Sequence, residues 1–154
     1  MADIQKITPF LWFDKNCEEA VNYYTSVFKN SKIISISRYP DDQQVGPEPN
    51  MQGKVLTAIF ELDGTRFMAL DGGPAFKFNE AVSFFVSCED QAEIDYFWEK
   101  LSHTPEAEMC GWCKDKFGVS WQIVPAKMGE IFEQNPGAMQ KMLQMKKIII
   151  EDLK

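Results

Sequence analysis

The sequence predicts an α+β fold in which two tandem βαβββ modules form a curved mixed sheet around a concave cavity, with the helices on the outer face. Three observations lead to this prediction. Segments with strand and helix periodicity follow one another in one order, that order occurs twice, and a Gly-bearing hairpin precedes the last strand of each half. We expect one domain over residues 1–125, with modules at about 4–73 and 78–125, and a C-terminal helical extension over residues 126–154.

The first module opens with a strand and a helix. Residues 7–13 are rich in β-favouring side chains, and a polar turn at 14–16 precedes a helical pattern over 17–28. Apolar side chains recur along that pattern at helical spacing. Glu18 and Glu19 lie in its first turn, where negative charge complements the helix dipole. We therefore predict an amphipathic helix.

Three further strands complete the first module. Residues 32–39 and 54–62 alternate Ile, Val, Phe and Thr with smaller or polar side chains, and an Asp-Gly pair at 63–64 indicates a hairpin whose return strand is 65–70. The intervening segment, Pro40 to Gly53, is polar, punctuated by Pro and Gly, and too long for a plain hairpin. We interpret it as a candidate lid or interface.

The second module repeats this order after a Gly-Gly-Pro break at 72–74. A strand pattern at 81–88 is followed by a helical pattern at 91–101, whose Ile, Phe, Trp and Leu side chains share one face. A further strand is expected around 107–114, and a turn then leads to a last strand at 119–125. The segment order predicts an internal duplication.

The extension has the character of a helical pair. Residues 128–132 form a short helical pattern, Asn-Pro-Gly at 135–137 is a break, and a second helix is expected over 138–147. The second pattern carries several methionines. Because Met fills irregular apolar gaps, this stripe indicates core or subunit packing rather than a cofactor site.

Composition excludes several classes of function. The 154 residues carry 16 Lys and Arg against 23 Asp and Glu, a net charge of −7, which repels phosphate backbones. No apolar run approaches the roughly 20 residues of a membrane-spanning helix. The first residues lack a basic start and an apolar signal core, so we expect a cytoplasmic protein with reduced thiols. Nucleic acid and membrane are not expected partners.

The pair Cys110 and Cys113 forms a CxxC motif with three interpretations. A redox dithiol favours a first thiol at a helix N-terminus, whereas the residues after Cys113 indicate a turn into a strand. A zinc site needs a second pair at similar spacing, which Cys17, Cys88 and His103 do not supply. A structural or incidental role is the favoured interpretation.

Three segments resemble a known family. These are TPFLWF at 8–13, EEAVNYY at 18–24 and CGWCKDKFGVSWQIVP at 110–125. They are similar to the PhnB-like family, often labelled 3-demethylubiquinone methyltransferase-like, within the vicinal oxygen chelate superfamily of glyoxalase I, extradiol dioxygenases and bleomycin resistance proteins. The resemblance covers about residues 4–125 and implies the paired βαβββ fold.

The resemblance also implies where a superfamily metal would be held. Its ligand positions fall on Pro9, Ser83 and Gln122, and on or beside Met68. Only the Gln side chain has a donor suited to a hard divalent cation, so we expect no metal. A methyl-donor site of the common type needs a Gly-rich turn between a strand and a helix, which the chain lacks. We therefore expect no cofactor.

What remains is the inferred cavity itself. Gln122 has the family-matched position, and alternation then sends Trp121 beneath the helices. Arg38 is either an anchor for an acidic ligand or a solvated charge at a strand end. The remaining candidate residues either line a ligand site or simply fill the space inside the curved sheet. The candidate ligand-binding residues are Pro9, Leu11, Phe13, Arg38, Met68, Ser83, Phe85 and Gln122.

Two functions from different classes follow. The first is a metal-independent protein that binds a small hydrophobic or aromatic molecule, as the bleomycin resistance relatives do by sequestration. The alternative is a lyase, dioxygenase or methyltransferase-like enzyme that uses Ser83, Gln122 or the Cys110/Cys113 pair on an unnamed substrate. Binding is favoured, because no inferred pocket residue is a general base or nucleophile with an activating partner. A homodimer is expected in either case.

Overall fold

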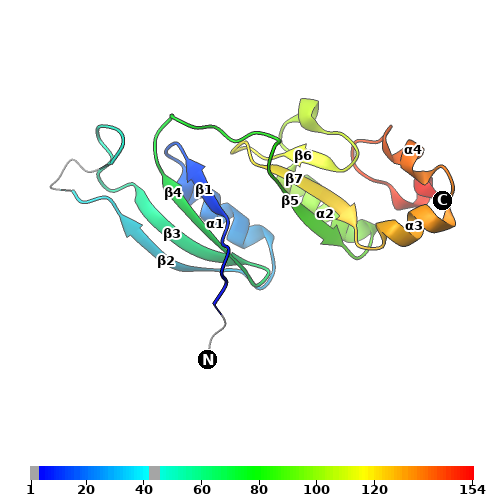
Figure 1. Ribbon diagram of the computed structural model, residues 1–154, viewed down its shortest axis with the longest axis horizontal. Coiled ribbons are helices and arrows are strands. Elements are labelled where there is room, and N and C mark those ends of the chain that lie inside the picture. Colours follow the sequence, from blue (N-terminus) through cyan, green and yellow to red (C-terminus); the bar gives the residue numbers. More distant parts are fainter. Residues whose placement is uncertain (1–3, 42–45) are drawn as a thin grey trace. The chain divides into compact units, whose positions relative to one another are not determined.

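The computed structural model describes residues 4–41 and 46–154 (Figure 1). The chain divides into two compact units, Met1–Lys77 and Phe78–Lys154. Each contains a mixed sheet with a helix packed on it, and the predicted α+β class is confirmed. Within the described residues, no helix has the length and apolar character needed to cross a membrane.

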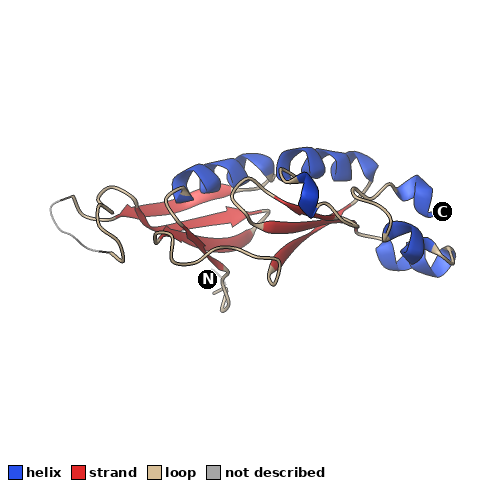
Figure 2. Ribbon diagram, turned by 90° about the horizontal axis from the view of Figure 1, so that it is seen from above, coloured by secondary structure: helices blue, strands red, loops and turns tan. Residues whose placement is uncertain are grey.

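Unit 1 is a four-stranded sheet with one helix. The sheet order is β1-β4-β3-β2, with β1 parallel to β4 and the other neighbours antiparallel. The helix lies on one face of its strands (Figure 2). The elements are β1 (Phe10–Phe13), α1 (Cys17–Val27), β2 (Lys32–Arg38), β3 (Val55–Leu62) and β4 (Thr65–Asp71).

The core of unit 1 lies between α1 and this sheet face. Ala20, Val21 and Tyr24, which the helical spacing placed on one side, are fully buried. Their burial removes the apolar face of the helix from water, which is the main source of stability for such a layer. The buried strand residues are Leu11, Phe13, Val55, Ala58, Phe60, Leu62, Phe67 and Ala69.

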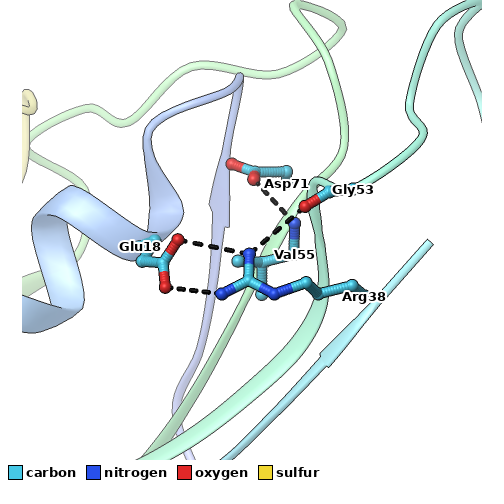
Figure 3. Close-up of polar contacts among 5 residues, drawn as sticks. All are labelled: Glu18, Arg38, Gly53, Val55 and Asp71. Carbon is cyan, nitrogen blue, oxygen red and sulfur yellow. Dashed lines mark hydrogen bonds and ion pairs between the residues drawn. The ribbon is translucent and has the colours of Figure 1, made fainter.

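A buried carboxylate joins three segments of unit 1. Asp71, at the end of β4, accepts hydrogen bonds from the backbone N–H of Cys17 at 2.9 Å and of Val55 at 3.0 Å. Its own carbonyl accepts from the Tyr39 hydroxyl at 3.0 Å. Figure 3 shows the contact with Val55. The start of α1 and the start of β3 are thereby held at the end of β4.

The predicted hairpin at 63–64 is confirmed. Asp63 and Gly64 both have positive φ, 48° and 82°, as a tight two-residue turn between twisted strands requires. The preceding long loop is closed at its base by hydrogen bonds between Tyr39 and the backbone of Gly53 and Lys54. The lid or interface proposed for residues 40–53 includes 42–45, which lie outside the described residues, and this role stays a prediction.

Unit 2 is a three-stranded sheet with one long helix and a C-terminal extension. The sheet order is β5-β7-β6, with β5 parallel and β6 antiparallel to β7. Helix α2 packs on one face of it. The elements are β5 (Ser83–Cys88), α2 (Gln91–Leu101), the 3₁₀ helix η1 (Pro105–Ala107), β6 (Trp112–Lys114), β7 (Ser120–Pro125), α3 (Met128–Gln134), α4 (Ala138–Met142) and the 3₁₀ helix η2 (Ile150–Leu153).

The second module has one strand fewer than the predicted βαβββ order. Residues 78–154 are all described and form three strands. The strand expected around 107–114 shortens to Trp112–Lys114, because Cys110 and Gly111 have positive φ, 41° and 90°, and turn the chain. A 3₁₀ turn beginning at Pro105 stands where a further strand would be. Proline lacks the N–H that a ladder needs.

The extension packs on the second module. The helix expected over 138–147 ends at Met142, because residues 145 and 146 leave the helix and hydrogen-bond to the turn that precedes β6. The carbonyls of Met145 and Lys146 accept from the N–H groups of Cys110 and Gly111. The predicted packing role of the methionines holds for Met142 and Met145, which contact a buried cluster of Val124, Ala138, Ile148 and Leu153. Met139 is 55% exposed.

Replacing the buried carboxylate should destabilise the protein strongly. Asp71→Ala leaves two buried N–H groups without an acceptor, so we expect the free energy of unfolding to fall by roughly 2–5 kcal/mol. Asp71→Asn should cost less, because its amide oxygen still accepts. Urea denaturation followed by circular dichroism measures both changes.

Glu99→Gln is the matched control, since it removes one negative charge from an exposed position of α2. It should change stability by less than about 0.5 kcal/mol. Equal stability of Asp71→Ala and the wild type would contradict the anchoring role of the carboxylate.

Candidate functional site

The face of the unit 2 sheet opposite α2 carries two rows of side chains. Residues paired across neighbouring strands share a face, and the register pairs Gln122 with both Phe85 and Trp112. An amide is therefore flanked by two aromatic rings. The adjacent row, two residues along β7, pairs Ser120 with Ser83 and Lys114. We call these the aromatic row and the polar row.

The two rows are joined by one hydrogen bond. Gln122 Nε2 donates to Ser83 Oγ at 2.9 Å, which orients the amide. Gln122 and Ser83 are half-buried, while the Phe85 ring is 57% exposed. A half-exposed aromatic ring beside an oriented amide offers an apolar contact and a directional polar contact together.

The polar row contains an unsatisfied hydroxyl. Ser120 is 2% exposed, and its Oγ has no hydrogen-bond partner. At the end of the same row, Lys114 forms an ion pair with Glu80. The hydrogen bond and charge of Lys114 lower the pKa of the Glu80 carboxyl.

The opposite face is core, as the alternation of β7 predicts. Trp121 is 3% exposed, and its Nε1 donates to Oδ2 of the buried Asp115 at 2.8 Å. Oδ1 of Asp115 accepts from the N–H of Phe117 and Val119 at 2.8 and 3.0 Å. Trp121 is thus buried on one face of the sheet, while Gln122, the next residue of β7, lies on the other face.

The unit 1 candidates do not share one face. Met68 is paired with Phe10 and is half-buried, whereas Leu11 is paired with Ala69 in the core. Leu11 and Phe13 therefore lie on the sheet face opposite Met68, so these three candidate residues do not line one site together. Pro9 precedes β1, and its carbonyl accepts from the N–H of Met68 at 2.9 Å.

Arg38 has an internal partner. Its guanidinium binds both carboxylate oxygens of Glu18 on α1, at 3.2 and 2.6 Å, and the Gly53 carbonyl at 3.2 Å (Figure 3). This fork-to-carboxylate contact lowers the pKa of Glu18. Both side chains are about half exposed, so this ion pair contributes much less to the stability of the protein than a buried ion pair would. The role of Arg38 as an anchor for an acidic ligand stays a prediction.

Some residues of these faces were not identified from the sequence. Trp112 and Lys114 join the rows only through the register of β6 with β7. In unit 1, Trp12 lies beside Phe76, with ring centroids 4.9 Å apart, and its Nε1 donates to the Gly73 carbonyl. The alternation of β1 could have indicated Trp12. No pattern within a single strand could have indicated the β6 residues.

The four cysteines are free thiols, and three of them are buried. Burial, followed by the negative charges of Asp115 and Glu108, raises the pKa of Cys113 to about 12. Burial likewise raises the pKa of Cys17 and of Cys88 to about 12. The described residues contain no group of three or more His, Cys, Asp or Glu side chains placed to hold a metal ion. His103 is exposed.

The fold defines an α+β protein of two modules, the second of which carries an aromatic row and a polar row on the sheet face opposite α2. The family model described as 3-demethylubiquinone-9 3-methyltransferase matches residues 5–124, and the chain belongs to this family. No curated protein matches the chain.

The chain is also similar to solved structures. A PhnB protein from Bacillus cereus is 41% identical, with a TM-score of 0.64, and the match covers 79% of this chain and 98% of that one. A protein from Pseudomonas aeruginosa is 23% identical over 80% of this chain and 97% of that one, with a TM-score of 0.59, and shares the fold. A Staphylococcus aureus protein is 34% identical over 80% and 97%, with a TM-score of 0.37.

The raised pKa of Cys113 predicts low reactivity in the native protein. At pH 8 a thiol of pKa about 12 is ionised to about one part in ten thousand, and only the thiolate reacts with iodoacetamide. We expect Cys113 to stay unmodified in native protein and to react fully in urea, as mapped by peptide mass spectrometry. Rapid native alkylation of Cys113, or a Cys110–Cys113 disulfide formed near the cytosolic redox potential, would instead support a redox dithiol.

Proposed function

We propose that the protein binds a small hydrophobic or aromatic molecule, without a metal, on the face of the unit 2 sheet that carries Gln122. The observation that supports this most directly is the aromatic row, in which an oriented amide lies between Phe85 and Trp112. Small-molecule sites combine mostly apolar contacts with a few placed polar groups, and this row has that composition.

The chemistry of the row favours a planar ligand. The exposed Phe85 ring provides an apolar surface for stacking or edge contacts with another ring. Because one N–H of Gln122 is already used by Ser83, the amide keeps its carbonyl oxygen and its second N–H for a ligand. These groups can fix the orientation of a hydroxyl, carbonyl or amide substituent.

Metal independence is supported by the residues at the superfamily ligand positions. Pro9 has no side-chain donor, and Met68 is a soft thioether. Ser83 and Gln122 are hydrogen-bonded to each other. A hard divalent cation favours several oxygen or imidazole ligands, and these four residues do not provide that set.

The alternative is an enzyme, as the family description suggests by naming a methyl transfer. Gln122 and Ser83 are hydrogen-bonded to each other, and among the described residues neither is hydrogen-bonded to a His or carboxylate that would activate it. Sequestration is therefore the better supported mechanism. Chemical change of a bound probe would favour the enzyme instead.

Binding should depend on the two central residues of the aromatic row. We expect 2-naphthamide to shift the side-chain amide resonances of Gln122 in ¹⁵N-¹H spectra, and Gln122→Leu and Phe85→Ala each to weaken binding by about tenfold, because each removes a polar or aromatic contact. Mass spectrometry should recover the probe unchanged. Protein dialysed against a chelator should bind equally well.

Gln140→Leu is the matched control, because Gln140 is exposed on α4. It should leave the affinity unchanged. Loss of binding after chelator treatment would contradict metal independence, and an unperturbed Gln122 resonance with every aromatic probe would contradict the site.

We also propose that the protein is a homodimer. Ile4 and Ile7 are 90% and 85% exposed, although the Gln5 side chain holds this segment against the backbone of Arg66. Ordered apolar side chains at a surface favour burial against a second chain. Light scattering should give a mass near twice 17.7 kDa. A monomer at micromolar concentration would contradict this proposal.

A further inference from the structure

The polar row of unit 2 offers a second group of contacts beside the aromatic row. Ser120 Oγ is buried and has no hydrogen-bond partner. A buried hydroxyl without a partner carries a desolvation cost, which a ligand group that accepts from it would offset. Alternation along β7 places it on the same face as Gln122.

A cation flanks this hydroxyl. Lys114 is the β6 residue paired with Ser120, and its side chain is 25% exposed. In the present structure its ammonium group pairs with Glu80, whose side chain is 60% exposed. One carboxylate of the chain itself thus lies at the end of a row that also contains two hydroxyls.

We propose that the molecule bound on this face is an aromatic carboxylic acid, whose carboxylate pairs with Lys114 and accepts from Ser120 Oγ while its ring lies along the aromatic row. Glu80 holds the ammonium group until this ligand replaces it. The inference rests on the proposed function, and it adds the chemical class of the ligand.

The spacing of the rows fits this class. Residues two apart on one strand are separated by about 6.4–6.8 Å, so the two rows are reached together by a molecule with one or two rings and an acidic substituent. One ammonium group opposes a single negative charge. The protein's net charge of −7 gives no general attraction for a more highly charged anion.

The test compares 2-naphthoate with 2-naphthamide, which have nearly the same shape and differ in charge. We expect wild-type protein to bind the acid more tightly than the amide. Lys114→Gln should weaken binding of the acid by about tenfold and leave the amide unchanged, because only the acid loses a charge-assisted contact. Glu80→Gln should strengthen binding of the acid by about two- to fivefold, since it removes the competing carboxylate.

Ser120→Ala separates a ligand contact from a structural role. It removes a buried hydroxyl with no partner, so the unliganded variant should melt at the same temperature as the wild type or about 2–4 °C higher. The same variant should bind 2-naphthoate several-fold more weakly. A purely structural residue would not give weaker binding together with equal or greater stability.

The outcomes distinguish this inference from the proposed function. Equal affinity for acid and amide, with no effect of Lys114→Gln, would overturn the carboxylate assignment and leave aromatic binding in place. Binding of neither probe at the Gln122 face would overturn the proposed function and this inference with it. Weaker binding of the acid to Glu80→Gln would contradict the exchange of carboxylates.

Discussion

The structure depends on two buried aspartates, one in each unit. Asp71 ends the central strand β4 and accepts from the first N–H of α1 and the first N–H of β3. Asp115 begins the turn before β7 and accepts from two backbone N–H groups and from the Trp121 indole. A buried carboxylate is expensive unless it is fully hydrogen-bonded, and each of these satisfies several donors that would otherwise be buried alone. In both units the carboxylate therefore sets where a strand meets its neighbours.

The anchor in unit 2 leads directly to the candidate site. Because Asp115 holds the Trp121 indole on the helix side, alternation sends Ser120 and Gln122 to the opposite face. A shift of one residue in this strand would exchange core and surface side chains, which burial of the indole opposes. The same interaction that stabilises the core thus keeps an amide and a hydroxyl on the other face.

Local pattern was enough for the helices and most strands. The spacing of Ala20, Val21 and Tyr24 identified α1, and the Asp-Gly pair identified the hairpin between β3 and β4. The short β6 strand and the early end of α4 were not predicted. Both depend on hydrogen bonds between the turn before β6 and the segment after Met142. These two segments are far apart in the sequence, so no periodic pattern in either one indicates the contact.

For the candidate site, alternation by itself determined which residues of one strand share a face, and it correctly placed Gln122 opposite Trp121. The family resemblance suggested Ser83 as a companion and alternation added Phe85, and the register of β5 with β7 puts both on the face of Gln122. Only the tertiary structure decided the neighbours across strands: Trp112 and Lys114 beside Gln122 and Ser120, and Glu18 as the partner of Arg38. The physical reason is that a strand's period of two is a property of its own backbone, whereas register comes from hydrogen bonds and buried groups contributed by other segments.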